Sequence, residues 1–362
     1  MPNNDFKAVL LQWYSLYHRH LPWRETRDPY RIWVSEIILQ QTRVEQGLGY
    51  YRRFIERFPD MASLAMASED EVLRMWQGLG YYSRGRNLLA AAKNAGGIFP
   101  TTYEGVRAMK GVGDYTAAAV CSIAYGMPYA VVDGNVYRVL ARFFGISTPI
   151  DSPAGKREFA SLAKKLLDRN NPGIYNQALM DFGAIQCVPR SPDCNACPLQ
   201  GGCAAFTNGR IDELPVKKKA AAKQVRHLNY LIATAGDMTF IRKRSAGDIW
   251  QGLYEFPMIE TSVSVDYADT LMQLPEFRQL FPPESSKILS IELQQSGVRH
   301  ILTHRILIAN FFRIVLSPTT EISGYLRVPI ADLPSYPFPR LLLNRLGQRH
   351  RDVASQPHQK AT

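Results

Sequence analysis

The chain has 362 residues, which is long enough for two or three domains. Of these residues 46% are hydrophobic, 11% aromatic and 21% charged, a composition that excludes general disorder. The 43 Lys and Arg residues outnumber the 32 Asp and Glu residues, and the net charge of +11 favours a polyanionic partner, although a basic soluble enzyme has the same balance. There is no apolar run of about 18 residues and no basic-then-apolar leader, so we expect a cytoplasmic protein without a membrane span.

Residues 1–210 predict one helix after another. Apolar side chains recur at helical spacing from Ile32 to Val44, in a stretch that ends at Pro59. Ser68 lies three residues before Glu71, as in a capping box, and predicts a helix that closes at Gly78 or Gly80. Further on, the Gly-Val-Gly turn at 111–113 runs directly into a helix of small residues.

The pattern changes after residue 212. Pro215 and the lysine triplet at 217–219 indicate a linker, and the following residues alternate as strands do, with a second strand-like run in "RILIANFFRIVLS". We therefore expect a multidomain α and α+β protein: a helical domain over residues 1–212, a basic linker over 213–226, an α+β domain over 227–348 and a disordered tail over 349–362.

Four cysteines form the strongest local motif, with the spacing C-x6-C-x2-C-x5-C; they are Cys187, Cys194, Cys197 and Cys203. Clustered thiols in a reducing compartment indicate a metal site more often than disulfides. The spacing alone leaves a tetrahedral zinc and an iron–sulfur cluster equally favoured. The fifth cysteine, Cys121, has apolar neighbours and is expected in the core.

This cysteine spacing resembles the iron–sulfur loop of the endonuclease III and MutY superfamily of DNA glycosylases. "MKGVGDYTAAAV" resembles the helix–hairpin–helix of that superfamily, with Lys110 where proline is usual, and "VVDGNVYRVL" resembles the segment that follows it. "LPWRETRDPYRIWVSEIILQQTRVE", "WQGLGYYSRGRNL" and "NQALMDFGAIQC" resemble the MutY adenine-glycosylase branch. The resemblance implies an all-helical helix–hairpin–helix glycosylase domain with one [4Fe–4S] cluster per chain in the 187–203 loop, and a C-terminal Nudix-like α+β domain.

The resemblance assigns roles to two carboxyl groups. A helix glutamate is usually a solvated charge, but Glu36 lies beside Trp33 and Ile37, which would raise its pKa, and it resembles the general acid that protonates adenine. Asp133 reads as a helix N-cap and resembles the anion that stabilises the sugar cation. Asn135 and Tyr115 resemble its partners. Because bifunctional relatives have a lysine at the place of Tyr115, we expect base excision without efficient strand cleavage.

Other residues are assigned by the same resemblance. The adenine pocket is expected from Leu21, Trp23, Arg24 and Gln177. DNA contacts are expected from Gln41 and Tyr82, which would insert between bases, and from Arg84, Arg86, Gly111, Gly113 and Arg190. Core packing for Trp23, a simple connector for the glycine turn and solvated surface for the arginines are the ordinary alternatives.

The second domain resembles the MutY domain that recognises 8-oxoguanine. The Phe-Ser-His of the family appears as Leu302, Thr303 and His304, which keeps a hydroxyl but loses an aromatic ring. No acidic Nudix box is present, so we expect no diphosphate hydrolysis. A purely structural appendage is the alternative.

The combined expectation is a monomeric, monofunctional adenine DNA glycosylase of base excision repair, in the nucleoid-associated cytoplasm of a bacterium. Its partner would be double-stranded DNA with adenine opposite 8-oxoguanine or guanine, and no membrane. Two alternatives stay open: a glycosylase of the same fold for another lesion, and a non-catalytic DNA-binding regulator with a metal loop.

Overall fold

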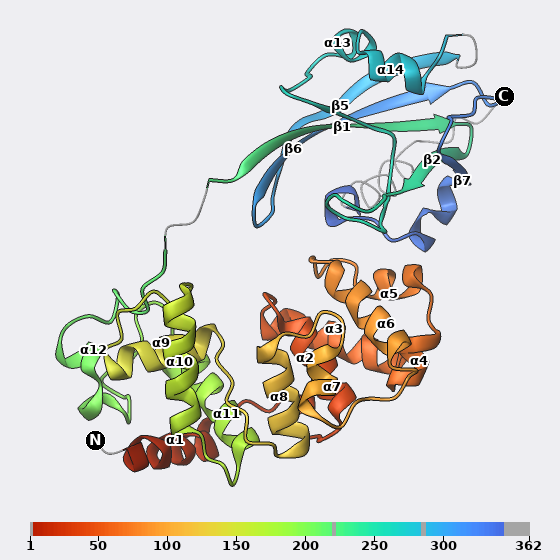
Figure 1. The fold of residues 1–362 in the computed structure, drawn as a ribbon. Helices are drawn as coiled ribbons and strands as arrows, with labels where there is room; N and C mark the ends of the chain where they lie inside the picture. Colours follow the sequence, from red (N-terminus) through yellow and green to blue (C-terminus); the bar gives the residue numbers. More distant parts are fainter. Residues whose placement is uncertain (1–2, 219–221, 284–286, 344–362) are drawn as a thin grey trace, which may run out of the picture. The chain divides into compact units, whose positions relative to one another are not determined.

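The computed structural model describes residues 3–218, 222–283 and 287–343 and divides them into two compact units (Figure 1). Unit 1 contains residues up to Ala67 and again from Asn87 to the end of the helical region, and unit 2 contains Ser68–Arg86 together with the C-terminal region. The expected tail at 349–362 lies outside the described residues. No helix in the described ranges is long and apolar enough to cross a membrane.

The first two hundred residues are helical, as the periodicity predicts. The helices are α1 Asn3–Tyr17, α2 Pro29–Leu39, α3 Val44–Arg57, α4 Met61–Met66, α5 Glu69–Met75, α6 Ser83–Asn94, α7 Tyr103–Ala108, α8 Asp114–Tyr125, α9 Gly134–Phe144, α10 Pro153–Leu166, α11 Pro172–Asp181 and α12 Ala204–Thr207. The apolar stretch that ends at Pro59 is broken into α2 and α3 around Gln41, whose φ of 58° cannot continue a helix. Ser68 caps α5 through a hydrogen bond from Glu71 N, as expected.

Packing in unit 1 determines where the site lies. α2 packs against α8, and α11 packs against α1, α8 and α9. Their core contains large buried side chains such as Phe6 of α1, Phe159 of α10 and Tyr175 of α11, each at most 1% exposed. Residues far apart in the sequence are thereby brought to one place between α2, α8 and the start of α9.

Unit 2 contains a mixed sheet with the order β3-β2-β1-β6-β5, in which β4 also pairs with β1 and β7 with β2. Its strands are β1 Gln224–Ala235, β2 Met238–Lys243, β3 Tyr254–Glu255, β4 Met258–Thr261, β5 Ile288–Ile301, β6 Arg305–Leu316 and β7 Leu326–Pro329. β1 and β6 are parallel, and the other pairs are antiparallel. α13 Ala268–Met272 and α14 Pro275–Leu280 cover one face of the sheet, and Phe338 and Leu342 pack on the other (Figure 1).

Unit 2 includes a segment that the sequence assigns to the helical domain. Asp70 of α5 pairs with Lys243 of β2 at 2.6 Å and accepts a hydrogen bond from the Tyr254 hydroxyl at 3.2 Å. The Arg86 guanidinium donates to the carbonyl of Gln251. These contacts are polar and partly exposed, so the apolar periodicity of the helices gives no sign of them.

Candidate active site

A cavity of about 660 Å³ opens in unit 1 where α2, α8 and α9 meet. Glu36 of α2, Tyr115 of α8, and Asp133 and Asn135 at the start of α9 all line it. Glu36 lies far from the other three in the sequence, and the packing of α2 on α8 brings them together. The cavity therefore places two carboxyl groups before the same empty space.

Burial changes the proton affinity of Glu36. Loss of solvent raises the pKa of its carboxyl to about 7, and the negative charge of Asp133 acts in the same direction. A hydrogen bond from the Tyr115 hydroxyl and the positive charge of Arg24 oppose this rise. Near neutral pH, a large share of Glu36 is therefore protonated and able to donate a proton.

Asp133 has different surroundings. Its side chain caps α9, accepting a hydrogen bond from Val136 N at 2.7 Å and another from Asn135 Nδ2 at 2.9 Å. The pKa of Asp133 lies above its ordinary value, because burial raises it by more than these hydrogen bonds and the charge of Arg138 lower it. Donors are thus aimed at the Asp133 carboxylate, whereas at Glu36 the loss of solvent outweighs the Tyr115 hydrogen bond and the Arg24 charge and favours the neutral carboxyl.

Arg138, which the sequence analysis did not single out, supports this pair. Its guanidinium donates to Asn135 Oδ1 at 2.8 Å, to Cys187 O at 2.7 Å and to Gly183 O at 2.5 Å. One buried cation thereby fixes the residue that holds Asp133 and the first cysteine of the cysteine loop. Its place one helical turn after Asn135 is the signal that would have indicated it.

The four expected pocket residues all line this cavity; they are Leu21, Trp23, Arg24 and Gln177. Leu21 and Trp23 are each 6% exposed and form an apolar wall. Arg24 is bound by the fully buried Asp181, which also pairs with Arg19 at 2.5 Å.

The amide of Gln177 is oriented by Tyr14, whose hydroxyl donates to Gln177 Oε1 at 2.9 Å. Tyr14 and Asp181 are therefore supporting residues that the sequence analysis missed. Asp181 lies four residues after Gln177 on the same helix, which is the available signal.

Two of the expected DNA contacts are buried in this structure. Tyr82 is 5% exposed and its hydroxyl accepts a hydrogen bond from Gly78 N. Arg84 is 8% exposed and donates to Gly80 O. The neighbouring Tyr81 is 45% exposed, with a φ of 46° that turns its ring outward.

Other expected contacts are exposed. Gln41 lies on the rim of the catalytic cavity, and Arg190 is exposed in the cysteine loop. Arg86 is partly buried by its hydrogen bond to Gln251. Gln41 and Arg190 are accordingly better placed to meet a partner than Arg86.

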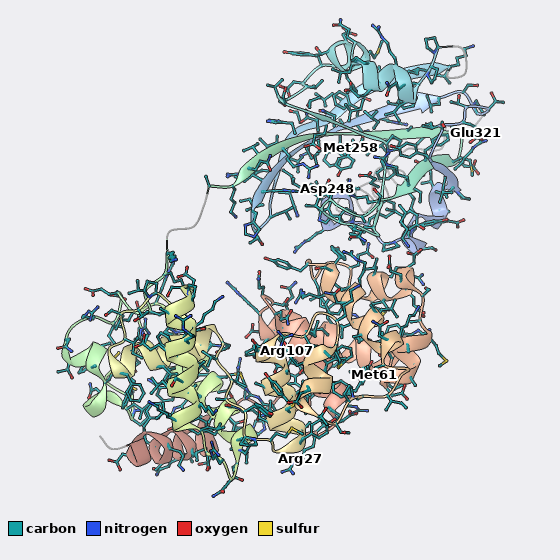
Figure 2. The ribbon with its side chains drawn as sticks, in the orientation of Figure 1. Arg27, Met61, Arg107, Asp248, Met258 and Glu321 are labelled. Carbon is teal, nitrogen blue, oxygen red and sulfur yellow. The ribbon has the colours of Figure 1, made fainter. Side chains whose placement is uncertain are left out.

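The glycine turn between α7 and α8 forms an exposed helical hairpin. Gly111 has a φ of 81°, and Gly113 is the N-cap of α8. Arg107, marked in Figure 2, pairs with Asp114 at 2.5 Å and donates to Val112 O at 3.0 Å, which braces the turn. A Cβ on Gly113 would meet nothing within 4 Å, so there is open space beside this residue at the start of α8.

The four cysteines of the 187–203 loop are half-buried free thiols. Arg142 is 2% exposed and donates to the carbonyls of Val188 and Pro189 and to Cys187 Sγ at 3.4 Å. Backbone N–H groups also bond to the sulfurs of Cys197 and Cys203. Among the described residues, no three His, Cys, Asp or Glu side chains are arranged to hold a single metal ion. Four thiols with N–H donors aimed at sulfur nevertheless fit the ligand chemistry of an iron–sulfur cluster.

Unit 2 contains a second cavity of about 790 Å³, lined by Tyr81 and by the turn between β5 and β6. This turn consists of Leu302, Thr303 and His304, and Thr303 and His304 are exposed. The hydroxyls of Thr303 and Tyr81 are hydrogen-bonded to each other. The cavity has apolar walls and hydroxyl, imidazole and guanidinium groups along its edge.

Comparisons with known proteins agree with this architecture. Residues 34–169 match the HhH-GPD superfamily of base excision DNA repair proteins, and residues 229–346 match the NUDIX domain family. A thermostable thymine-DNA glycosylase has a similar structure, with 30% identity and a TM-score of 0.53 over 57% of this chain and 97% of that one. An endonuclease III in a non-covalent DNA complex shares the fold at 20% identity, with a TM-score of 0.50 over 58% of this chain and 98% of that one.

Curated relatives of this chain are adenine DNA glycosylases. Adenine DNA glycosylase of Buchnera aphidicola from Schizaphis graminum is 32% identical over 263 residues, which cover 71% of this chain and 76% of the relative. The human adenine DNA glycosylase is 42% identical over 213 residues, which cover 55% of this chain and 39% of the human protein. With its helix–hairpin–helix unit, its Nudix-like unit and two carboxyl groups before one cavity, the chain belongs to the adenine DNA glycosylase family, whose members are hydrolytic N-glycosylases.

Proposed function

We propose that this enzyme flips adenine out of duplex DNA and removes it where it lies opposite 8-oxoguanine or guanine. The observation that carries the proposal is the pairing of Glu36, with its pKa raised to about 7, and Asp133, held by helix N–H groups, at a single cavity. Two carboxyl groups with different surroundings are what hydrolysis of a glycosidic bond requires.

The reaction follows from these two groups. The Glu36 carboxyl donates its proton to N7 of adenine, and the C1′–N9 bond breaks with its electron pair going to the base. The Asp133 carboxylate stabilises the sugar cation as it forms. Glu36, now ionised, accepts a proton from the water that adds to C1′, so the products are adenine and an abasic site. Tyr115 has no amine to form a Schiff base, and strand cleavage is not expected.

The pocket walls fit a flipped purine. Leu21 and Trp23 supply the apolar surface for the ring, and Arg24 and Gln177 supply polar contacts along its edge. Because Tyr14 donates to Gln177 Oε1, the amide nitrogen is left to donate to an acceptor on the base. We propose that Gln41 and Tyr81 fill the gap that the flipped adenine leaves in the base stack; Tyr81 takes the role expected of Tyr82.

The exposed hairpin is suited to the DNA backbone. Gly113, the N-cap of α8, has open space at its Cβ position, and the partial positive charge of a helix N-terminus favours a phosphate. Arg190 adds a cation in the cysteine loop. The net charge of +11 supports the same partner, and binding should weaken steeply with salt.

The cysteine loop is assigned to one [4Fe–4S] cluster. Cys187, Cys194, Cys197 and Cys203 would hold it, and bound iron–sulfide would supply structural cross-linking rather than hydrolysis. Arg142 and the N–H donors would balance the charge on the sulfurs. A purified protein with brown absorbance and about four iron atoms per chain supports this assignment, whereas a colourless protein with stoichiometric zinc overturns it.

We assign recognition of the base opposite adenine to unit 2, whose turn Leu302–His304 offers a hydroxyl and an imidazole beside Tyr81. Adenine is a normal base, so the enzyme has to recognise a mispair by the base opposite the adenine.

The domain boundaries that we propose are 1–212 and 227–348, joined by the basic linker 213–226, in a monomer that works on the bacterial nucleoid.

A panel of mispairs tests the proposal. Duplexes with adenine opposite 8-oxoguanine, guanine or thymine, and one with thymine opposite guanine, are incubated with the wild type and with Glu36→Gln. We expect adenine release in the order 8-oxoguanine, guanine, thymine, and none from the variant. Release of thymine instead of adenine would show a glycosylase for another lesion, and DNA binding without release of any base would show a regulator.

A further inference from the structure

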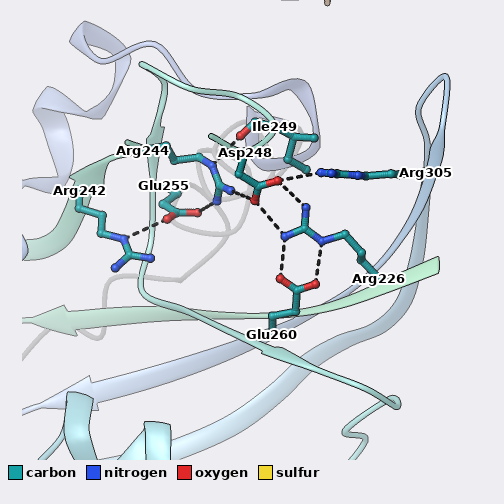
Figure 3. Close-up of polar contacts among 8 residues, drawn as sticks. All are labelled: Arg226, Arg242, Arg244, Asp248, Ile249, Glu255, Glu260 and Arg305. Atoms are coloured by element: carbon teal, nitrogen blue, oxygen red, sulfur yellow. Dashed lines mark hydrogen bonds and ion pairs between the residues drawn. The ribbon is translucent and has the colours of Figure 1, made fainter. Parts of the chain in front are cut away.

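An ion-pair network in unit 2 converges on one carboxylate, Asp248 (Figure 3). Arg226 of β1 binds Asp248 in a bidentate pair, with nitrogen–oxygen distances of 2.6 and 2.9 Å. Arg244 donates to Asp248 Oδ2 at 2.8 Å, and Arg305 donates to Asp248 Oδ1 at 2.7 Å. Three guanidinium groups from separate segments are therefore held by one side chain in the loop between β2 and β3.

The three arginines differ in their other partners. Arg226 also pairs with Glu260 at 2.6 Å, and Arg244 also pairs with Glu255. If Asp248 lost its charge, Arg226 and Arg244 would each still be paired with one of these glutamates. Arg305, which is 34% exposed, is held by Asp248. The bond between Asp248 and Arg305 is thus the link that depends most on Asp248.

Arg305 is the residue directly after the turn Leu302–His304 and the first residue of β6. The turn is closed by a hydrogen bond from Leu302 N to Arg305 O at 2.8 Å. Its ends are held by the bond from Gln224 N to His304 O at 3.1 Å and by Lys223 Nζ, which donates to Leu302 O at 2.8 Å. A side chain that fixes Arg305 therefore restrains the C-terminal end of the turn, next to His304.

Asp248 also lies at the cavity that contains the turn. Gly247, Asp248 and Trp250 line the same 790 Å³ space as Thr303 and Tyr81. The hydrogen bonds from Arg226 hold the pKa of Asp248 well below its usual range, so the carboxylate is charged throughout the physiological pH range and the restraint is permanent.

We propose that Asp248 is a positioning residue for recognition of the opposite base: through Arg305 it fixes the turn Leu302–His304 in the conformation that presents Thr303 and His304 to an oxidised purine. This inference rests on the proposed function of that turn. It assigns to Asp248 and Arg305 an effect on the choice between mispairs, and no part in the cleavage of the glycosidic bond.

The test compares single-turnover adenine release from duplexes with adenine opposite 8-oxoguanine and opposite guanine. In Asp248→Asn and in Arg305→Gln we expect the ratio of the two rates to fall by about tenfold, the size of one lost base contact, with release opposite guanine unchanged. Arg242→Gln is the matched control, because it removes an arginine from the Glu255 end of the network and leaves Asp248 intact. It should keep the wild-type ratio.

The two variants separate positioning from a direct contact with phosphate. Asp248→Asn frees the charge of Arg305, whereas Arg305→Gln removes it. If Arg305 bound phosphate, Asp248→Asn would strengthen DNA binding and Arg305→Gln would weaken it equally for both mispairs; either result overturns the inference. Additive effects on the rate ratio in the double variant Asp248→Asn/Arg305→Gln would also overturn the inference. Substitutions of two residues that act through one shared hydrogen bond must have non-additive effects.

Failure of the proposed function gives a different pattern. A wild-type enzyme without preference for 8-oxoguanine, or a Thr303→Ala variant with an unchanged ratio, would refute recognition by the turn and the inference with it. A preference that Thr303→Ala lowers and that both Asp248→Asn and Arg305→Gln leave intact would refute the inference alone.

Discussion

The proposed role of Glu36 as general acid predicts how the rate of adenine release depends on pH. With its pKa raised to about 7, Glu36 is mostly protonated at pH 6 and mostly ionised at pH 8. If its carboxyl is the general acid, the single-turnover rate is constant at low pH and falls by about tenfold between pH 6 and pH 8.

Tyr115 provides the perturbation. Its hydroxyl donates to the Glu36 carboxylate and lowers the pKa, so Tyr115→Phe removes a bond that favours the charged form. A hydrogen bond to a charged group contributes about 1.5 kcal/mol or more, which corresponds to an upward shift of roughly one pH unit in the midpoint. The variant should therefore keep its rate at pH 8 better than the wild type does.

Tyr14→Phe is the matched control. It removes a hydroxyl from the same site, but this hydroxyl bonds to Gln177 and not to Glu36. Its midpoint should stay at the wild-type value while its affinity for the substrate falls. The assay is single-turnover release of adenine from pH 5.5 to 9. A flat profile in the wild type, or a midpoint that falls in Tyr115→Phe, would refute the assignment of Glu36 as the acid.

Four further predictions concern stability and DNA binding. Because the pKa of Glu36 rises from its ordinary 4.5 to about 7 on folding, its charge costs up to about 3 kcal/mol above pH 7 and nothing below pH 4.5. Glu36→Gln should thus unfold at a higher temperature than the wild type at pH 8 and at the same temperature at pH 4. Arg142→Ala should destabilise the protein by about 3 kcal/mol and lower its iron content, since several carbonyls lose a buried donor; normal stability and iron would contradict this. Gly111→Ala should lower the melting temperature, because its Cβ would lie 2.7 Å from Asn87 Cβ at a φ of 81°. Gly113→Ala should fold normally and bind DNA more weakly, and unchanged binding would remove the hairpin from the interface.

Several features could be predicted because they depend on local chemistry. The helical first half followed by a sheet can be read from apolar spacing, and the cap at Ser68 follows from its distance to Glu71. The meeting of Glu36 with Asp133 followed from a resemblance to a family, because no periodicity relates two residues nearly a hundred positions apart.

Other features depend on three-dimensional contacts that the sequence does not encode locally. Tyr81 and Tyr82 are chemically identical, yet Tyr81, with left-handed backbone, is 45% exposed and Tyr82 only 5%. Arg84 is of a residue type that commonly contacts phosphate, but it is buried. The pairing of Arg305 with Asp248 joins residues 57 positions apart through the sheet, and neither residue belongs to a motif.

Release of free adenine by Glu36→Gln tests the central claim most directly. Wild type and variant are compared in single turnovers, at saturating enzyme, on a duplex with adenine opposite 8-oxoguanine, and their affinities for that duplex are measured beside the rates. We predict a rate lower by at least about a hundredfold with DNA affinity preserved. Adenine release at the wild-type rate would contradict the account.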